Sequence, residues 1–317
     1  MPTPRRRVLV SAPHALRVID RYRTELEAAG CEIVVAHVRE RLEEAELLPL
    51  VGNVDGIICG DDRITSRVLD AAPRLRVISK WGTGIDSIDC EAATRRGVAV
   101  CNTRNAFSEP VADTVMGYLL LFARQLDRIN SDMHAGRWCR YDLVALGECT
   151  LGVIGAGNCG TAVIRRAAGF GMRILANDPR PIEPSLVAET GLVQTSLDEL
   201  LAESDFVTLH TELNRGSVHL LDSRRLAQMR PTAYLVNTSR GPVIDEIALA
   251  AALEAGQIAG AALDVFADEP LPSTSPLRQL TNVYLAPHTA NRSPAAAERV
   301  HANTIRNLLQ FLEPDHD

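Results

Sequence analysis

The sequence lacks any long apolar run and any excess of positive charge. No stretch approaches the roughly 20 consecutive apolar residues of a membrane-spanning helix. The formal net charge of −7 and the pI near 5.7 argue against nucleic acid or a membrane surface as a partner, because either would require a basic face. The basic run Arg5-Arg6-Arg7 is followed by an apolar stretch too short for a signal peptide, so we expect a cytoplasmic protein.

Paired cysteines and metal-ligand spacings are also missing. The chain has seven cysteines, an odd number, and no CxxC pair. They stand at Cys31, Cys59, Cys90, Cys101, Cys139, Cys149 and Cys159. This scatter argues against a disulfide framework or a zinc site, so we expect reduced thiols and no bound metal.

Short apolar strands alternate with helical segments along most of the chain. Its 317 residues are enough for two domains, and 46% apolar with 23% charged residues is typical of a globular protein. A helix is predicted near 14–29. Strands are predicted at 6–12, 31–37, 55–60, 74–80 and 97–102. Runs that are apolar on both faces and separated by helices indicate a parallel sheet covered on each side.

A second alternating series follows a long helix. Ser108 is the expected N-cap of that helix, and Pro110 lies in its first turn. The helical pattern ends at about residue 126, which predicts an irregular arm over 126–150. The alternation starts again at "LGVIGAGNCG" and runs to "NVYLAPH", before a closing helix over 294–312. The predicted fold class is therefore α/β with two doubly wound parallel sheets, and these patterns leave open which sheet the closing helix covers.

The strongest local signal is a glycine loop at 155–160. A strand runs into Gly155-x-Gly157-x-x-Gly160, and a helix begins inside the loop. Glycines let the backbone turn tightly and approach a pyrophosphate, whose charge the helix N-terminus attracts. A simple glycine turn and a methyltransferase loop are the alternatives for this motif taken alone. We expect a dinucleotide to be bound by the whole loop, Gly155, Ala156, Gly157, Asn158, Cys159 and Gly160.

Asp178 supports the dinucleotide interpretation. It ends the next strand, where an acidic residue accepts hydrogen bonds from the adenosine ribose hydroxyls. A carboxylate repels a 2′-phosphate, so NAD is predicted in preference to NADP. Arg180, two residues further on, weakens that preference.

Three side chains suited to hydride transfer follow three later strands. Arg240 comes after "YLVN", Glu269 after "IAGAALDVF" and His288 after "NVYLAP". A guanidinium binds a carboxylate with two hydrogen bonds, and imidazole exchanges protons near neutral pH. Any one of them alone is equally well explained as a polar loop residue. Because ligands bind at the carboxyl ends of parallel strands, the set as a whole predicts a site for an acidic carbonyl substrate.

With these motifs, the sequence resembles the D-isomer-specific 2-hydroxyacid dehydrogenases over nearly its full length. The resemblance rests on the loop at 155–160 together with "KWGTGIDSID", "VNTSRG", "ALDVFADEP" and "APH", found in this order. It implies that Arg240 binds the substrate carboxylate and that His288 exchanges the proton. It further implies that Glu269 holds His288 by a hydrogen bond and favours its protonated form. The later motifs argue against a methyltransferase.

The resemblance also implies the remaining contacts. Asp264 would meet the nicotinamide carboxamide, with His210 and Thr238 as further cofactor-side residues. The substrate carboxylate would be held from the other domain by the backbone of Gly82, Thr83 and Gly84.

The same resemblance implies the domain arrangement. A Rossmann NAD-binding domain, 103–288, would be inserted in a flavodoxin-like substrate domain made of 1–102 and 289–317. A homodimer is expected through the long helix and the arm, 108–150. The C-terminal regulatory module of longer phosphoglycerate dehydrogenases is not expected.

The sequence departs from the family pattern at several points. Lys80 stands where many relatives have arginine, so an anion contact there would be a point charge. The segment "LHTELN" replaces a commoner pattern on the cofactor side. Lys80, Trp138, Tyr141 and Arg292 are candidates for substrate selection, although Trp138 and Tyr141 are also explained by packing of the arm against a second subunit.

Two other functions fit the same motifs. A phosphonate- or phosphite-type anion could replace the carboxylate, and an NAD-sensing corepressor-like binding protein could keep the fold. The predicted activity is NAD-dependent interconversion of a D-2-hydroxyacid and its 2-oxoacid, with the particular acid left open.

Overall fold

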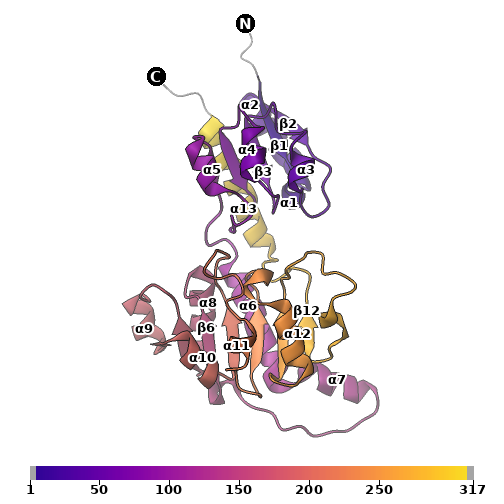
Figure 1. Cartoon of the computed structure of the whole chain (residues 1–317), viewed down its shortest axis with the longest axis vertical. Helices are drawn as coiled ribbons and strands as arrows, with labels where there is room; N and C mark the ends of the chain where they lie inside the picture. The colour runs from indigo at the N-terminus through magenta and orange to yellow at the C-terminus, as the bar shows by residue number, and fades with distance from the viewer. Residues whose placement is uncertain (1–4, 313–317) are drawn as a thin grey trace. The chain divides into compact units, whose positions relative to one another are not determined.

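The computed structural model describes residues 5–312, and these form two compact units (Figure 1). One unit comprises the described residues up to Ala106 together with those from Ser293 onward, and the other is Phe107–Arg292. The second unit therefore interrupts the first in the chain. Its limits lie a few residues beyond the boundaries expected at 102/103 and 288/289.

The first unit contains a five-stranded parallel sheet with the order β2-β1-β3-β4-β5. This is the flavodoxin-like doubly wound order. Residues of β3 and β4 are buried on both faces, as expected for strands covered by helices on each side. The strands are β1 Arg6–Val10, β2 Cys31–Val35, β3 Gly56–Cys59, β4 Val77–Lys80 and β5 Ala99–Cys101.

Helices from both ends of the described chain cover this sheet. The closing helix predicted over 294–312 is confirmed as α13, and it packs on β3 and β4 of the first unit. Gly56 makes the close approach possible, because an added Cβ there would lie 2.8 Å from Leu308 Cδ1. The helices are α1 Pro13–Leu16, α2 Ile19–Ala28, α3 Glu44–Leu47, α4 Ser66–Asp70, α5 Cys90–Arg95 and α13 Pro294–Leu312.

The single helix predicted near 14–29 is wrong, because α1 and α2 are separate. The chain leaves the helical conformation at Val18, where φ is −127° and ψ is 1°. Ala15 and Ile19 are nevertheless both buried, so the apolar periodicity continues across the break and conceals it.

The second unit contains a seven-stranded parallel sheet with the order β12-β11-β10-β9-β6-β7-β8. Starting from β6, this is the Rossmann order extended by one strand. The strand order reverses between the parallel neighbours β6 and β9, and a ligand crevice is expected beyond the carboxyl ends of these strands. The strands are β6 Thr150–Ile154, β7 Arg173–Asn177, β8 Val193–Gln194, β9 Phe206–Leu209, β10 Tyr234–Asn237, β11 Gly260–Leu263 and β12 Val283–Leu285.

The helices of the second unit bury one continuous apolar core against this sheet. Side chains such as Leu235 from β10 and Leu249 from α12 are fully buried in it. The α-helices are α6 Ser108–Arg124, α7 Leu126–His134, α8 Asn158–Gly169, α9 Pro184–Thr190, α10 Leu197–Glu203, α11 Ser223–Leu226 and α12 Glu246–Glu254. The 3-10 helices are η1 Leu146–Glu148, η2 Gly241–Val243 and η3 Pro276–Gln279.

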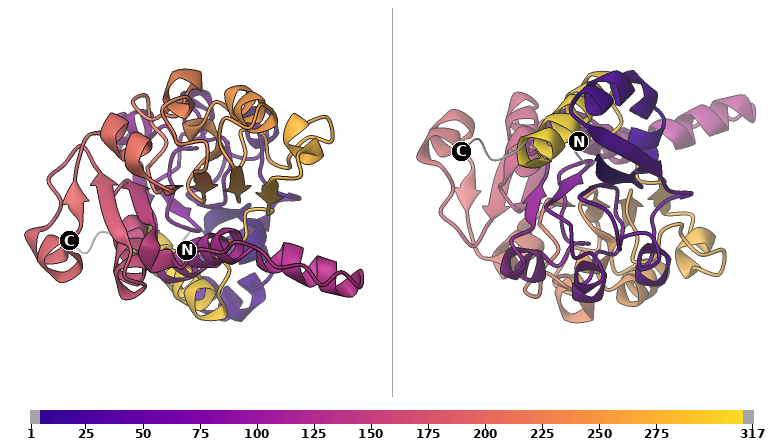
Figure 2. Two further views of the ribbon diagram at one scale, coloured as in Figure 1. Left: turned by 90° about the horizontal axis from the view of Figure 1, so that it is seen from below. Right: turned by 90° about the horizontal axis from the view of Figure 1, so that it is seen from above.

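Two predictions about the segment 108–150 need correction. Ser108 is not the N-cap of α6 but its first helical residue, since Phe107 occupies the cap position. The arm is not wholly irregular, because it begins with α7, which projects from the body of its unit in both further views (Figure 2). Gln125 separates α6 from α7 in a left-handed conformation, φ 45°, so the helical pattern restarts in a new direction.

The described helices give no membrane span. Within residues 5–312, none combines the length and the apolarity that are needed to cross a bilayer.

Candidate active site

The glycine loop follows β6, at the point in the sheet where the strand order reverses. Gly155 has φ +92°, and an added Cβ there would lie 2.6 Å from the His210 carbonyl oxygen. An added Cβ at Gly160 would lie 1.9 Å from the Gly155 carbonyl oxygen. These two glycines are therefore required by the packing of the chain against itself.

Gly157 is different, because an added Cβ would meet no described atom within 4 Å. It is the N-cap of α8, a helix of 12 residues. The first turn of this helix, which begins at Asn158 and is fully described, carries no acidic side chain. The free space and the unneutralised helix N-terminus suit a pyrophosphate brought close to the backbone.

Asp178 lies beside the loop, as its spacing predicted. Its Oδ2 accepts a hydrogen bond from Ala156 N at 3.0 Å, and its Oδ1 accepts one from Arg180 N at 3.0 Å. Burial acts to raise the pKa of Asp178, but these bonds and the Arg180 guanidinium outweigh it and lower the pKa below its usual value. The carboxylate is therefore ionised at neutral pH and can also accept hydrogen bonds from ribose hydroxyls.

His210 follows β9 and lies against the glycine loop. Its backbone N donates to Ile154 O at 2.8 Å, and its Nε2 is 3.0 Å from Thr208 Oγ1. Burial lowers the pKa of His210 to about 4, so the ring is neutral at pH 7. The ring can therefore contact a cofactor as a neutral hydrogen-bonding group rather than as a cation.

Two buried hydroxyls near the ends of β9 and β10 have no hydrogen-bond partner within residues 5–312. They are Thr211 Oγ1 and Thr238 Oγ1. Buried polar atoms in folded proteins are normally satisfied, so such atoms indicate a missing partner. Together with the space at Gly157, they fit a dinucleotide lying across these strand ends. Thr238 was predicted from the sequence, whereas Thr211 was missed because nothing in "LHTELN" distinguishes it.

Arg240 is placed by a side-chain-supported turn after β10. Asn237 Oδ1 accepts from Ser239 N at 3.0 Å, and Asn237 Nδ2 donates to Arg240 O at 2.9 Å. Gly241 then packs so closely on the next loop that an added Cβ would lie 1.9 Å from Phe266 C. The Arg240 turn and the loop that leads to Glu269 are thereby locked together.

The charge of Arg240 also reaches the glycine loop. Burial raises the pKa of the Cys159 thiol, while a hydrogen bond to Ser108 and the positive charge of Arg240 act in the opposite direction. Arg240 therefore lies within electrostatic range of the first turn of α8. Cys159 itself is partly buried.

Glu269 and His288 meet across consecutive strand ends. Glu269 Oε2 lies 2.9 Å from His288 Nδ1, and Glu269 Oε1 accepts from Phe266 N at 3.0 Å. Because a carboxylate can only accept, Nδ1 carries the hydrogen and Nε2 is the nitrogen that exchanges a proton. Each side chain is about one-third exposed, 32% in both cases, so the pair is accessible to a ligand.

Asp264 fixes the turn that carries His288. Its carboxylate oxygens accept from Thr289 N at 2.8 Å and Ala290 N at 2.9 Å, and its carbonyl oxygen accepts from His288 N at 2.8 Å. His288 has φ +51°, a conformation that a histidine adopts only when its surroundings impose it. Burial raises the pKa of Asp264, and the two backbone hydrogen bonds oppose that shift. Asp264 thus positions His288, a role that sequence reasoning missed, while its predicted nicotinamide contact stays a prediction.

The predicted substrate residues of the first unit lie at the end of β4 and in the loop that follows it. Lys80 is 4% exposed, and its Nζ donates to Asp61 Oδ1 at 2.9 Å. Gly82, with φ +123°, is buried, and Thr83 Oγ1 donates to Thr103 O at 2.9 Å. Gly84 is partly buried at the end of this loop. The pairing of Lys80 with Asp61 could not be read from the sequence, since nothing identifies which acid faces it.

The other candidates for substrate selection lie elsewhere. Trp138 and Tyr141 belong to the arm after α7. Trp138 is 81% exposed, and the Arg128 guanidinium lies 4.7 Å from the centre of the Tyr141 ring. Arg292 is exposed, and its backbone N donates to Thr289 O at 2.9 Å. Within the described residues, no three His, Cys, Asp or Glu side chains cluster as metal ligands would.

Comparisons with known proteins agree with this geometry. Residues 116–290 match the family described as "D-isomer specific 2-hydroxyacid dehydrogenase, NAD binding domain". A protein named glyoxylate reductase from Korarchaeum cryptofilum is 42% identical over 256 residues, 79% of this chain and 77% of that protein. A glyoxylate reductase from Thermofilum pendens is 38% identical over 294 residues, 89% of this chain and 86% of that protein.

A solved structure extends the likeness to the whole fold. A D-lactate dehydrogenase from Aquifex aeolicus, complexed with NAD and lactic acid, has a TM-score of 0.88 and is 27% identical. The match covers 96% of this chain and 95% of that one.

Proposed function

Since the chain belongs to the D-isomer-specific 2-hydroxyacid dehydrogenase family, we propose that it reduces a short 2-oxoacid of the glyoxylate type with NADH. That it is an NAD-dependent dehydrogenase acting on 2-hydroxyacids and 2-oxoacids follows from the family itself. The observation that carries the proposal is the Glu269–His288 pair at the same sheet edge as the glycine loop.

Each residue of the site has a definite task in this reaction. Arg240 binds the substrate carboxylate through charge-assisted hydrogen bonds and polarises the adjacent carbonyl oxygen. His288 Nε2 donates the proton that this oxygen gains, while Glu269 stabilises the resulting charge distribution by holding Nδ1. When bound, the reduced nicotinamide supplies the hydride that the carbonyl carbon receives. One hydride and one proton convert the 2-oxoacid to the 2-hydroxyacid, and the reverse steps run in oxidation.

The state of Lys80 favours a short substrate with a single anionic group. Its buried ammonium is already paired with Asp61, so a phosphate would have to displace or share that carboxylate. An arginine at this position would offer a planar fork for a second anion, which a lysine does not. The names of the relatives reported above also favour a 2-oxoacid over a phosphonate-type anion or a purely NAD-sensing role.

The arm supports a homodimer as part of the proposal. Leu126, Met133, Trp138 and Val144 are 52%, 50%, 81% and 45% exposed in the single chain. Apolar side chains gathered on a projecting segment are typical of an interaction surface. We expect this segment, 126–145, to pack against a second copy, and a cytoplasmic location remains our prediction.

Loss of NADH absorbance across a substrate panel tests the proposal. The panel contains glyoxylate, hydroxypyruvate, pyruvate, phosphohydroxypyruvate and a phosphonate analogue. The highest kcat/KM is expected for glyoxylate or hydroxypyruvate, with phosphohydroxypyruvate at least about tenfold lower, because Lys80 is already paired with Asp61. A preference for the phosphorylated acid would refute the short-substrate proposal. Tight NADH binding without turnover of any panel member would favour the nucleotide-sensing alternative.

A further inference from the structure

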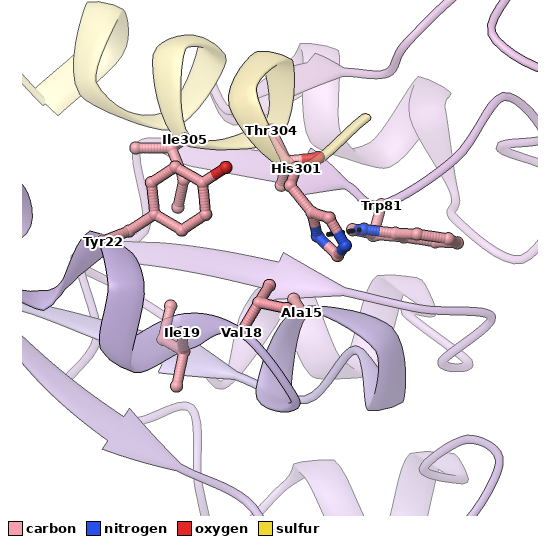
Figure 3. Close-up of a pocket in the computed structure, with 8 residues that line it drawn as sticks. All are labelled: Ala15, Val18, Ile19, Tyr22, Trp81, His301, Thr304 and Ile305. Atoms are coloured by element: carbon pink, nitrogen blue, oxygen red, sulfur yellow. Dashed lines mark hydrogen bonds between the residues drawn. The ribbon is translucent and has the colours of Figure 1, made fainter. Parts of the chain in front are cut away.

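Trp81 is anchored by a histidine from the far end of the chain. Its indole Nε1 donates a hydrogen bond to His301 Nδ1 at 3.0 Å, although the two residues are 220 positions apart (Figure 3). The indole also lies against His14, with ring centroids 4.4 Å apart. Trp81 and His301 are both buried, at 9% and 7% exposure, so the bond is shielded from competing water.

The direction of this bond fixes the state of His301. The indole N–H is only a donor, so Nδ1 must be an acceptor and the ring must be neutral, with its hydrogen on Nε2. Protonation would place two N–H groups face to face and break the bond. Burial lowers the pKa of His301, which favours the neutral ring; Glu298 opposes this effect, and Arg21 adds to it.

The charged groups around His301 come from several elements. On α2, Arg21 forms an ion pair with Glu298 of α13, with Arg21 Nη2 2.7 Å from Glu298 Oε2, and Tyr22 lies beside it. Lys80 precedes Trp81 and reaches its carbonyl oxygen at 3.4 Å. The His14 ring is tilted against the indole. Protonation of His301 would therefore add a positive charge to surroundings that already contain the charges of Arg21 and Lys80.

The space beside the pair does not form a second ligand site. It is lined by residues of α1, α2 and α13, Ile19, Tyr22 and Ile305 among them. Its volume of about 10 Å³ leaves room for about one water molecule. The Trp81–His301 contact therefore serves the structure around it.

That structure includes the loop predicted to hold the substrate carboxylate. Trp81 is covalently joined to Gly82, whose carbonyl oxygen accepts from Thr103 N at 2.9 Å. The loop is also held by Thr83 Oγ1, which donates to Thr103 O, and by Asn102 Nδ2, which donates to Thr83 O. One end of the loop is thus fixed by the residues after β5 and the other by the Trp81 side chain.

We propose that His301 is a positioning residue, whose neutral ring holds Trp81 and thereby sets the Gly82–Gly84 backbone for the substrate carboxylate. This proposal rests on the proposed function and on the family resemblance, which implies that the backbone of this loop contacts the carboxylate that Arg240 binds. It implies that substrate affinity falls when His301 is protonated, whereas the hydride step at Arg240 and His288 is little changed.

A fluorescence titration tests the contact without any substrate. The chain has two tryptophans, so Trp138→Phe leaves Trp81 as the only tryptophan, whose emission is excited selectively. As the pH falls from about 8 through and below about 6.5, the ordinary value for histidine, Trp81 emission is expected to change when His301 becomes protonated. The titration should disappear in the double variant Trp138→Phe/His301→Gln. It should persist in Trp138→Phe/His14→Gln, which removes the other ring beside the indole, and in Trp138→Phe/His37→Gln. An unchanged titration in the His301 variant would overturn the proposal.

Kinetics test the consequence for substrate. His301→Leu removes the acceptor and should raise KM for glyoxylate about tenfold, the effect of one lost buried hydrogen bond, with kcat within about twofold. His301→Gln restores an acceptor oxygen and should return KM towards wild type while removing its rise at low pH. Ile305→Val, a packing change one turn along the same helix, is the matched control and should leave KM unchanged.

The two proposals fail in distinguishable ways. If His301→Leu folds, as judged by circular dichroism, and keeps the wild-type KM, the positioning proposal is overturned. If the wild type turns over no 2-oxoacid, the proposed function fails, and the Trp81 titration still decides whether His301 controls the indole.

Discussion

Glu269 Oε2 and His288 Nδ1 lie 2.9 Å apart, and the other oxygen of Glu269 is held by its own loop through Phe266 N. The carboxylate therefore cannot turn away without losing a backbone hydrogen bond. This arrangement presents the His288 ring in one orientation, with Nε2 available for proton exchange.

Replacement of His288 should remove most turnover. His288→Ala is expected to lower kcat about 10²- to 10⁴-fold, because a positioned acid–base group contributes about that much. Glu269→Gln keeps the shape of the pair but removes its charge, so a smaller loss of about tenfold or more is expected. Steady-state NADH oxidation measures both. The exposed neighbour Asp268→Asn and the exposed His219→Ala should retain wild-type kcat; wild-type turnover in His288→Ala would disprove the assignment.

Replacement of Arg240 should act mainly on substrate binding. Arg240→Ala loses a charge-assisted pair of hydrogen bonds, so KM for the 2-oxoacid should rise by about 10²-fold or more. Arg240→Lys keeps the charge but not the planar fork and should recover only part of the loss. The affinity for NADH, measured by calorimetry, should change little. The exposed Arg224→Ala of α11 is the control, and an unaltered KM in Arg240→Ala would contradict the assigned role.

Replacement of two glycines of one loop by alanine should affect different properties, cofactor affinity at Gly157 and thermal stability at Gly160. Gly157→Ala meets no described atom within 4 Å, so the melting temperature without cofactor should stay close to wild type. Its methyl group would occupy space assigned to the pyrophosphate, so the Kd for NADH should rise about tenfold or more. Gly160→Ala would place a Cβ 1.9 Å from Gly155 O and should lower the melting temperature itself. Calorimetry of cofactor binding and of unfolding separates these effects, and cofactor affinity unaltered by Gly157→Ala would reject the pyrophosphate assignment.

His210 should make the stability of the protein depend on pH. Its pKa is lowered to about 4 in the folded chain, whereas an unfolded histidine titrates near 6.5. The unfolded state therefore binds more protons in this window, and the free energy of unfolding should fall as pH is lowered from about 6.5 towards about 4. Urea unfolding of the cofactor-free protein should show a shallower pH dependence in His210→Gln than in wild type. The exposed His37→Gln should keep the wild-type slope, and an equal slope in His210→Gln would refute the effect.

Much of this structure was predictable because its signals are local. The glycine loop, the strand before it and Asp178 lie within one short stretch, and the apolar period of α13 is uninterrupted from Pro294 to Leu312. That Glu269 and His288 lie at one edge followed from a different rule, that neighbouring parallel strands end at the same edge of a sheet. The hydrogen bond between them was implied by the family resemblance.

The errors arose where side-chain patterns do not determine the backbone. Periodicity continues through Val18, so the break between α1 and α2 was hidden. In the arm, α7 has no buried residue, which deprives it of the apolar stripe by which a helix is recognised. The positioning contacts of Asp264 and the Trp81–His301 bond depend on tertiary packing between distant segments, for which a single sequence provides no local pattern.

The place of α13 also has a consequence for synthesis on the ribosome. Gly56 in β3 is covered by Leu308 and Leu312, and Ser79 Oγ in β4 donates to Thr304 O at 2.8 Å. The sheet translated first thus receives one of its covering helices last. Until that helix emerges, the apolar face of β3 and β4 stays open to solvent, whereas the interrupting unit already has all of its strands. In nascent chains, the second unit is therefore expected to finish folding before the first.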